Sequence, residues 1–241
     1  SELRGSAGQL RVELEVEAAF AIRDITAGSD ERAAAAAAAG AVAPLVRMLQ
    51  VGVSGPQAHA AAAGALRCLA QDSDKRANAI VAAGALVMLV LLLEQGTPES
   101  SESAAATVRA LTGGSEPGDR KAAAVSAGVL LPLVQLMQPS RTLSREGRSS
   151  VVGALRNLSA GPAERKSMVL RAGALHPLVR VLDEGTPPED CVEASFALRN
   201  LATGSDERKA MVMAAGCLAP LVRLYEKGPA DGRSAAASAL R

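Results

Sequence analysis

A short apolar segment recurs five times at an almost constant spacing, and this regularity limits the possible folds more than any other feature. The copies read AAGAVAPLVRML, AAGALVMLVLLL, SAGVLLPLVQLM, RAGALHPLVRVL and AAGCLAPLVRLY. Their glycines are 44, 44, 45 and 43 residues apart, at Gly40, Gly84, Gly128, Gly173 and Gly216. A period of about 40–47 residues is typical of stacked helical units, each burying its apolar face against its neighbours. We therefore expect a stack of repeats.

A second segment alternates with the first and completes each repeat. It reads GALRNLSAG from Gly153 and FALRNLATG from Phe196, with weaker copies FAIRDITAG, GALRCLAQD and ATVRALTGG. Three helices are predicted per repeat. The first begins at a capping serine, as at Ser29, Ser73 and Ser205, and ends at the recurring glycine, which suits a left-handed C-cap. The second helix carries a proline in its first turn, and the third ends in the LRNL segment.

The composition argues against several classes of partner and location. With 26 basic and 25 acidic residues among 241, the formal net charge is only +1. This balance predicts no nucleic-acid and no membrane partner. The longest apolar run, Ala85–Leu93, is shorter than the roughly 20 residues that a membrane span needs. The N-terminus has no signal-peptide pattern, so we expect a cytoplasmic or nuclear protein.

Reactive side chains are few and scattered. Three cysteines, Cys68, Cys191 and Cys217, lack the spacing of a disulfide framework or a zinc site. The two histidines, His59 and His176, lie in different repeats, without a Ser or Cys partner in a catalytic arrangement. We therefore expect no catalytic, cofactor-binding or metal-binding residues and no enzymatic activity in this chain.

At the recurring segments the chain resembles the armadillo repeat family. The AAGA…PLVRLL and ALRNLA segments carry the resemblance, together with the glycine between a short first helix and a longer second one. It extends from about residue 10 to the C-terminus. HEAT repeats, which usually have two helices and no such glycine, fit less well. The resemblance implies an all-α, right-handed α-solenoid (a superhelix) with three helices per repeat.

We expect residues 1–241 to form a single armadillo domain, which the period divides into repeat units. The expected units are a partial repeat, four full repeats and a truncated one: 1–28, then 29–72, 73–115, 116–161 and 162–204, then 205–241. Both ends lack the polar capping helices that stable arrays need. The sequence therefore predicts a fragment of a longer protein, or self-association through uncapped ends.

The third helices are predicted to expose one face, which the resemblance places along a concave groove. At about 100° per residue, the apolar side of each helix separates from a side that carries an arginine. These arginines are Arg23, Arg67, Arg109, Arg156 and Arg199. The following position holds Asp24, Cys68, Ala110, Asn157 and Asn200.

The importin alpha group has an asparagine at this following position and a tryptophan four residues earlier. Only Asn157 and Asn200 match the asparagine, and this chain has no tryptophan. The LRNL helices instead resemble beta-catenin-like and plant-type armadillo proteins, the former of which bind acidic extended partners. The resemblance therefore implies a protein-interaction scaffold that binds an extended peptide segment, for which acidic side chains would suit the arginines. The expected groove residues are Asn157, Asn200, Arg156, Arg199, Phe196, Arg109, Arg67, Arg23, Asp24 and Glu193.

Other interpretations stay open. The arginines have acids seven or eight positions later, so a structural ion-pair ladder would explain them without a ligand; these acids are Asp30, Asp74, Glu116, Glu164 and Asp206. The chain could also be the substrate-recruiting arm of a U-box-type ubiquitin ligase, an importin-like adaptor or a self-associating array. The irregular connection from Gln138 to Ser150 places Arg141 three residues before Ser144, a spacing that some kinases accept.

Overall fold

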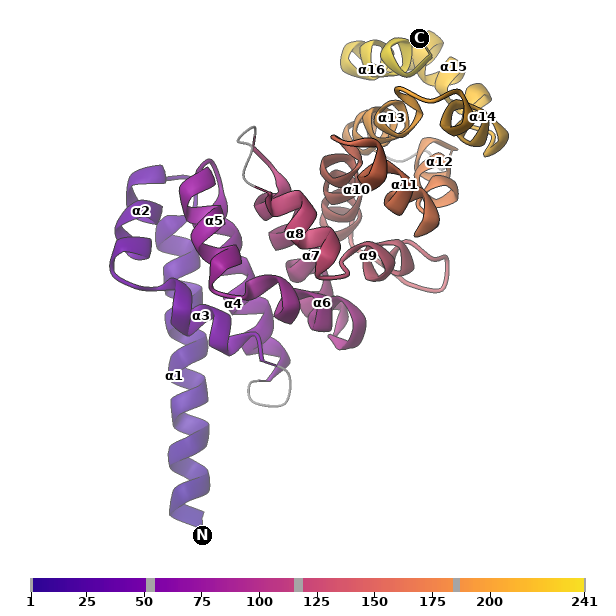
Figure 1. The fold of residues 1–241 in the computed structure, drawn as a ribbon. Coiled ribbons are helices and arrows are strands. Elements are labelled where there is room, and N and C mark those ends of the chain that lie inside the picture. Colours follow the sequence, from indigo (N-terminus) through magenta and orange to yellow (C-terminus); the bar gives the residue numbers. More distant parts are fainter. Residues whose placement is uncertain (1, 51–54, 115–118, 184–186, 241) are drawn as a thin grey trace. The chain divides into compact units, whose positions relative to one another are not determined.

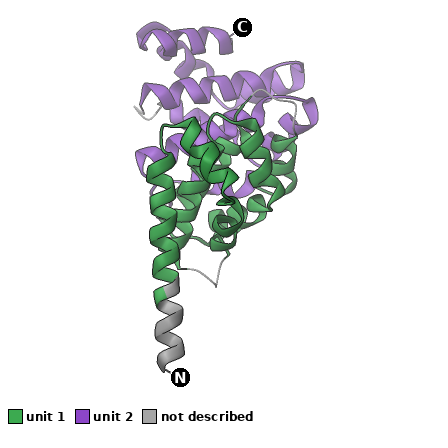
Figure 2. Ribbon diagram, turned by 90° about the vertical axis from the view of Figure 1, so that its left-hand side faces the viewer, with its two compact units in different colours: residues 1–129 green, residues 130–241 purple. Residues whose placement is uncertain are grey.

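The computed structural model describes residues 2–50, 55–114, 119–183 and 187–240 (Figure 1), and within these ranges it contains helices and no strands. The chain divides into two compact units, residues 1–129 and 130–241 (Figure 2). Each unit is a series of short helices in the predicted three-helix order. The expectation that residues 1–241 form one domain stays a prediction.

In the first unit, three long helices lie side by side and shorter helices cover them. The third helices α1, α4 and α7 pack in that order, and the second helices α3 and α6 pack on α4 and α7. The elements are α1 (Glu2–Thr26), α2 (Asp30–Ala38), α3 (Val42–Met48), α4 (Pro56–Ala70), α5 (Asp74–Ala82), α6 (Ala85–Gln95), α7 (Pro98–Thr112) and α8 (Arg120–Ser126).

The second unit repeats the same arrangement. Its third helices α10, α13 and α16 pack in order, while α12 and α15 cover α13 and α16. The elements are α9 (Leu130–Leu136), α10 (Arg145–Ser159), α11 (Ala163–Arg171), α12 (Leu175–Asp183), α13 (Pro188–Ala202), α14 (Asp206–Ala214), α15 (Leu218–Lys227) and α16 (Ala230–Leu240).

The predicted helix signals are present in the structure. Ser29, Ser73 and Ser205 each accept a hydrogen bond from the backbone N–H three residues later, at 3.3 Å. All five recurring glycines adopt the left-handed conformation, with φ between 84° and 93°. This conformation ends each first helix and starts the second. Helix α13 has Pro187 at its N-cap.

Small and aliphatic side chains make the core. On α4, Ala61, Ala62 and Ala63 are completely buried, and the hydroxyl of Thr107 on α7 donates to the carbonyl of Ala63 at 2.8 Å. Such small residues allow the backbones of successive third helices to approach closely. His59 is also buried, with Nε2 3.2 Å from the carbonyl oxygen of Gln50. No single described helix has the length and apolar character of a membrane span, although α5 and α6 together do, across a 77° bend.

A ladder of arginines on the first helices joins successive elements. Each side chain donates to carbonyl oxygens at the C-terminal end of the preceding third helix, as Arg76 does to Leu69 at 2.6 Å and Gln71 at 2.9 Å. The members are Arg32, Arg76, Arg120, Arg165 and Arg208. These contacts satisfy carbonyl groups that a helix end leaves without an intrahelical partner.

Two of these arginines also form ion pairs with acids that were suggested above as partners of the third-helix arginines. Arg76 forms an ion pair with Asp30 at 2.6 Å, and Arg120 pairs with Asp74. The suggested pairing of Asp30 with Arg23 and of Asp74 with Arg67 is therefore wrong. The acid of one first helix faces the arginine of the next first helix, which a count of positions along the chain does not reveal. Glu116 lies outside the described residues.

Candidate functional site

The predicted groove residues of the second unit lie on α10 and α13. Arg156 and Asn157 are half-buried on α10. Phe196, Arg199 and Asn200 are half-buried on α13, and Glu193 lies one turn before Phe196. These side chains are neither completely buried in the core nor fully exposed, as expected for a surface that can contact a ligand.

Phe196 is at the centre of a cluster that joins three helices. The guanidinium carbons of Arg156 and Arg199 lie 5.3 and 4.9 Å from the centre of its ring, within the range of cation–π attraction. Glu193 forms an ion pair with Arg156 at 3.3 Å. Arg199 donates to the hydroxyl of Ser238 on α16 at 2.7 Å. Both arginines are therefore held in place by neighbours from the protein itself.

A hollow of about 540 Å³ lies beside this cluster, between α13 and α16. Its apolar lining comes from Val192, Phe196 and two prolines, Pro188 and Pro229. The remaining lining residues are Glu189, Glu193, Asp231 and Ser234, so the charged residues among the described lining are acids. Glu189 pairs with exposed Arg145 at 3.4 Å. The ring of Phe196 already contacts two guanidinium groups, and the acids add negative charge to the wall of the hollow.

The two predicted asparagines each interact within the protein. The side-chain amide of Asn200 donates to the hydroxyl of Ser159 on α10 at 3.3 Å. Its carbonyl oxygen and second N–H are the remaining hydrogen-bonding groups of that amide. Asn157 has a half-buried side chain on α10 that also interacts within the protein.

In the first unit, the predicted residues are spread over α1, α4 and α7. Arg23 pairs with Asp24 at 2.8 Å and lies over the ring of Phe20 at 4.8 Å. Its side chain passes close to Gly64 on α4, where an added Cβ would lie 3.2 Å from Arg23 Cδ. Arg67 is exposed and Arg109 half-buried. These arginines are on neighbouring helices, but the structure does not bring them into one cluster like that around Phe196.

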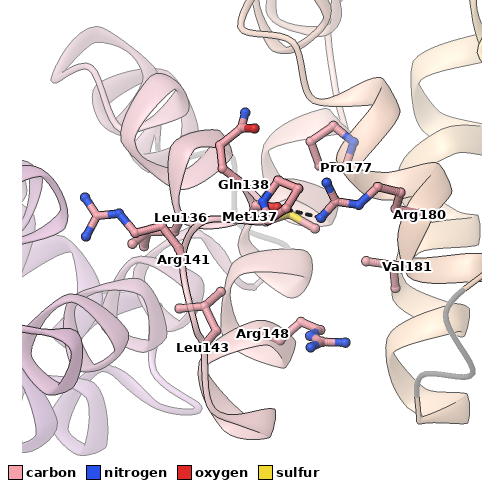
Figure 3. A pocket seen from close by; sticks show the side chains of 10 residues that line it. Leu136, Met137, Gln138, Arg141, Leu143, Arg148, Pro177, Arg180 and Val181 are labelled. Carbon is pink, nitrogen blue, oxygen red and sulfur yellow. Dashed lines mark hydrogen bonds between the residues drawn. The ribbon is translucent and has the colours of Figure 1, made fainter.

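A second hollow, of about 420 Å³, was not predicted (Figure 3). It lies between the end of α9, the connection to α10, and α12. The irregular connection after Gln138 was the only sequence signal near it. Its lining residues are Leu136, Met137, Gln138, Pro139, Arg141, Leu143, Arg148, Pro177, Arg180 and Val181.

Asp190 is a buried carboxyl near the start of α13, with 1% of its surface exposed. Burial raises the pKa of Asp190, because water no longer stabilises the ionised form. A hydrogen bond with Ser149 and the charge of Arg148 lower this pKa, whereas the charge of Glu189 raises it. Among the described residues, no group of three or more His, Cys, Asp or Glu side chains is arranged to hold a metal ion.

Comparison with protein-family models and with curated proteins found no match. Solved structures do match. A designed armadillo repeat protein in complex with the peptide (KR)4 gives a TM-score of 0.81 at 29% identity, over 93% of this chain and 90% of that chain. Computationally designed armadillo repeat proteins for modular peptide recognition give a TM-score of 0.83 at 29% identity, over 93% of this chain and 91% of that chain. An engineered protein gives a TM-score of 0.84 at 30% identity, over 95% of this chain and 90% of that chain. The fold is therefore an all-α solenoid.

Proposed function

Because the chain belongs to the armadillo repeat family, we propose that it is a scaffold that binds an extended segment of a partner protein along its third helices. The observation that carries this proposal is the cluster around Phe196 with its adjoining hollow. Half-buried amide, guanidinium and carboxylate groups on α10 and α13 can hydrogen-bond to a peptide backbone, which in extended form exposes its N–H and C=O groups. The peptide-recognising repeat proteins of similar structure support the same use of the fold.

In the second unit, the bound segment places a basic side chain in the hollow between α13 and α16. The charge of Arg156 is already matched by Glu193, and Arg199 is bound to Ser238. The hollow itself is lined by Glu193, Glu189 and Asp231, with the ring of Phe196 in its wall. An incoming carboxylate would meet like charges there, whereas a lysine or arginine would meet opposite ones.

In the first unit, the expectation of acidic partner side chains stays a prediction. Exposed Arg67 and half-buried Arg109 carry positive charge on neighbouring helices α4 and α7. A segment that contacts them is expected to place carboxylates there, because guanidinium groups bind carboxylates through two parallel hydrogen bonds.

Fluorescence polarisation with labelled peptides tests the proposal. We expect (KR)4 to bind more tightly than (DE)4 to the second unit's groove in the full chain. The double variant Glu193→Gln, Asp231→Asn should weaken (KR)4 by about tenfold, since two attractive charges are lost. Glu207→Gln, an exposed acid on the first helix α14, is the matched control and should leave binding unchanged.

Two results would contradict different parts of this proposal. If the chain prefers (DE)4 and the double variant binds (DE)4 still more tightly, the proposal of a basic side chain in the hollow is contradicted. The proposal of a peptide-binding groove would then still hold. Failure of both peptides to bind at millimolar concentration would contradict the groove itself.

Narrower interpretations stay predictions. They are the closer likeness to beta-catenin-like and plant-type proteins than to importin alpha, the substrate-recruiting arm of a U-box-type ubiquitin ligase, the importin-like adaptor, and self-association through the ends. The proposed binding involves no catalysis and no cofactor in this chain. Cytoplasmic or nuclear location is likewise a prediction.

A further inference from the structure

The second hollow is a candidate ligand site separate from the third-helix groove. It lies between α9 and α12, which are second helices of successive repeats, and the start of α10 closes one side. Helix α9 stops at Leu136 after 7 residues, as the second helix α3 of the first unit does, whereas the second helices α6 and α12 have 11 and 9 residues. The chain then takes a long connection before α10 begins at Arg145. The hollow lies beside this connection, whose residues Gln138, Pro139, Arg141 and Leu143 line it.

The charged residues that line this hollow, in the part of the chain that the structure describes, are three arginines: Arg141, Arg148 and Arg180. Figure 3 shows Arg148 of α10 and Arg180 of α12 extending into the space between these two helices, whereas Arg141 points away from them. A charge pattern of this kind is complementary to an anion.

Both inward arginines are positioned by contacts within the protein. Arg180 donates one N–H to the carbonyl oxygen of Met137 at 2.8 Å. This bond restricts the direction in which the guanidinium group points. Arg148 lies close enough to buried Asp190 for its charge to lower the pKa of that carboxyl. A ligand therefore meets arginines whose orientation has already been restricted, which reduces the entropy lost on binding.

Apart from Gln138, the other described lining residues are apolar. Leu136, Met137 and Val181 are buried core residues at its floor, and Leu143, Pro139 and Pro177 complete the wall. A volume of about 420 Å³ is within the range of small-ligand sites.

We propose that this hollow binds a carboxylate attached to an apolar body. The carboxylate contacts Arg180 and Arg148, and the apolar part packs on Leu136, Leu143 and Val181. Two sources share this chemistry: the C-terminal residue of a peptide with an aliphatic side chain, and a free organic acid. The site does not depend on the proposed peptide groove, which uses the third helices.

Titration of the full chain followed by ¹⁵N–¹H NMR tests the site with three probes. These are N-acetyl-leucyl-leucine, the same dipeptide as its C-terminal amide, and 4-phenylbutyrate. We expect the dipeptide acid to shift the amides of residues 136–148 and 177–181, and the amide form to bind at least about tenfold more weakly, because the charge-assisted hydrogen bonds are lost. If 4-phenylbutyrate also binds, the hollow is a site for organic acids in general. If it does not bind, the hollow is specific for the C-terminus of a peptide.

Two variants and a control make the test specific. Arg180→Gln should weaken the dipeptide acid by about tenfold or more. Leu143→Glu should abolish binding by placing an internal carboxylate beside the arginines, and this variant leaves the Arg180–Met137 bond in place. Arg223→Gln, the corresponding arginine of helix α15, is the matched control and should bind as the unmodified chain does. Equal binding of acid and amide, no binding of either acid, or full binding by both variants would overturn the proposal.

Discussion

At the scale of single residues, the first-helix arginines contribute more to stability than their surface-like sequence positions suggest. Arg120 is 5% exposed, pairs with Asp74, and donates to the carbonyl oxygens of Leu111 and Gly113 at 2.7 and 2.9 Å. Arg120→Gln leaves the Asp74 carboxylate and these carbonyls without their donor, so we expect the free energy of unfolding to fall by about 3 kcal/mol. Urea titration followed by circular dichroism measures this loss.

Arg208 provides the matched control for Arg120. It makes the same carbonyl contacts, to Leu201 at 3.0 Å and Thr203 at 2.9 Å, but forms no ion pair with a described acid. Arg208→Gln should therefore lower the free energy of unfolding by only about 1 kcal/mol. Equal losses for the two variants would show that the ion pair with Asp74 adds nothing.

Asp190 is expected to make stability depend on pH. Burial raises its pKa in the folded chain, so the folded state prefers the protonated carboxyl. The protonated Asp190 carboxyl therefore contributes its full stability below the ordinary aspartate pKa. This stability is lost as the pH rises through the raised pKa of Asp190 in the folded chain. Asp190→Asn should therefore be more stable than the unmodified chain at pH 7, with a difference that shrinks as the pH falls toward about 4. Unfolding titrations between these values measure the difference.

Removal of the Ser149 hydroxyl gives a second test of the pH dependence that is expected from Asp190. Its hydrogen bond to Asp190 lowers the carboxyl pKa and so favours the ionised form. Ser149→Ala should cost more stability at pH 7 than at low pH. A cost that does not change with pH would mean that the Asp190 carboxyl is not ionised in the folded state at neutral pH.

At the scale of helices, the recurring glycines determine where the first helix ends and the second begins. Gly84 has φ 84°, and an added Cβ would meet no atom within 4 Å. Gly84→Ala should therefore cost only the strain of the left-handed backbone, about 1–2 kcal/mol. Gly84→Asn should recover part of that loss, because asparagine tolerates this conformation. Thermal unfolding of both variants tests the expectation, and an equal loss for Ala and Asn would contradict it.

The sequence predicted most helices because their signals are local. Ser73 and Gly84 act on backbone groups within a few residues, so their effects follow from position in the chain alone. Contacts between repeats were harder to predict. The partner of Asp30 is Arg76, 46 residues later, although Arg23 is much nearer in the sequence. The acid-lined hollow likewise depends on Asp231 of helix α16, whereas only Glu193 was predicted to lie on the same face as Phe196.

At the scale of the whole molecule, stability is expected to vary among equivalent helices. In repeat arrays each helix is stabilised mainly by its immediate neighbours, so local burial determines how easily it opens. First helix α5 buries Arg76, Ala77 and Ile80, whereas first helix α14 buries only Val212. Met211 and Met213 on α14 are 43% and 55% exposed.

Native-state hydrogen exchange measures this difference directly. We expect the amides of α14 to exchange at least about tenfold faster than those of α5, because opening α14 exposes little new apolar surface. Val212→Ala should accelerate exchange in α14 and leave α5 unchanged, since a nearest-neighbour array transmits a local loss only to adjacent repeats. If α5 and α14 instead exchange together through one global opening, the chain unfolds as a single cooperative body, and local burial does not determine the order of opening.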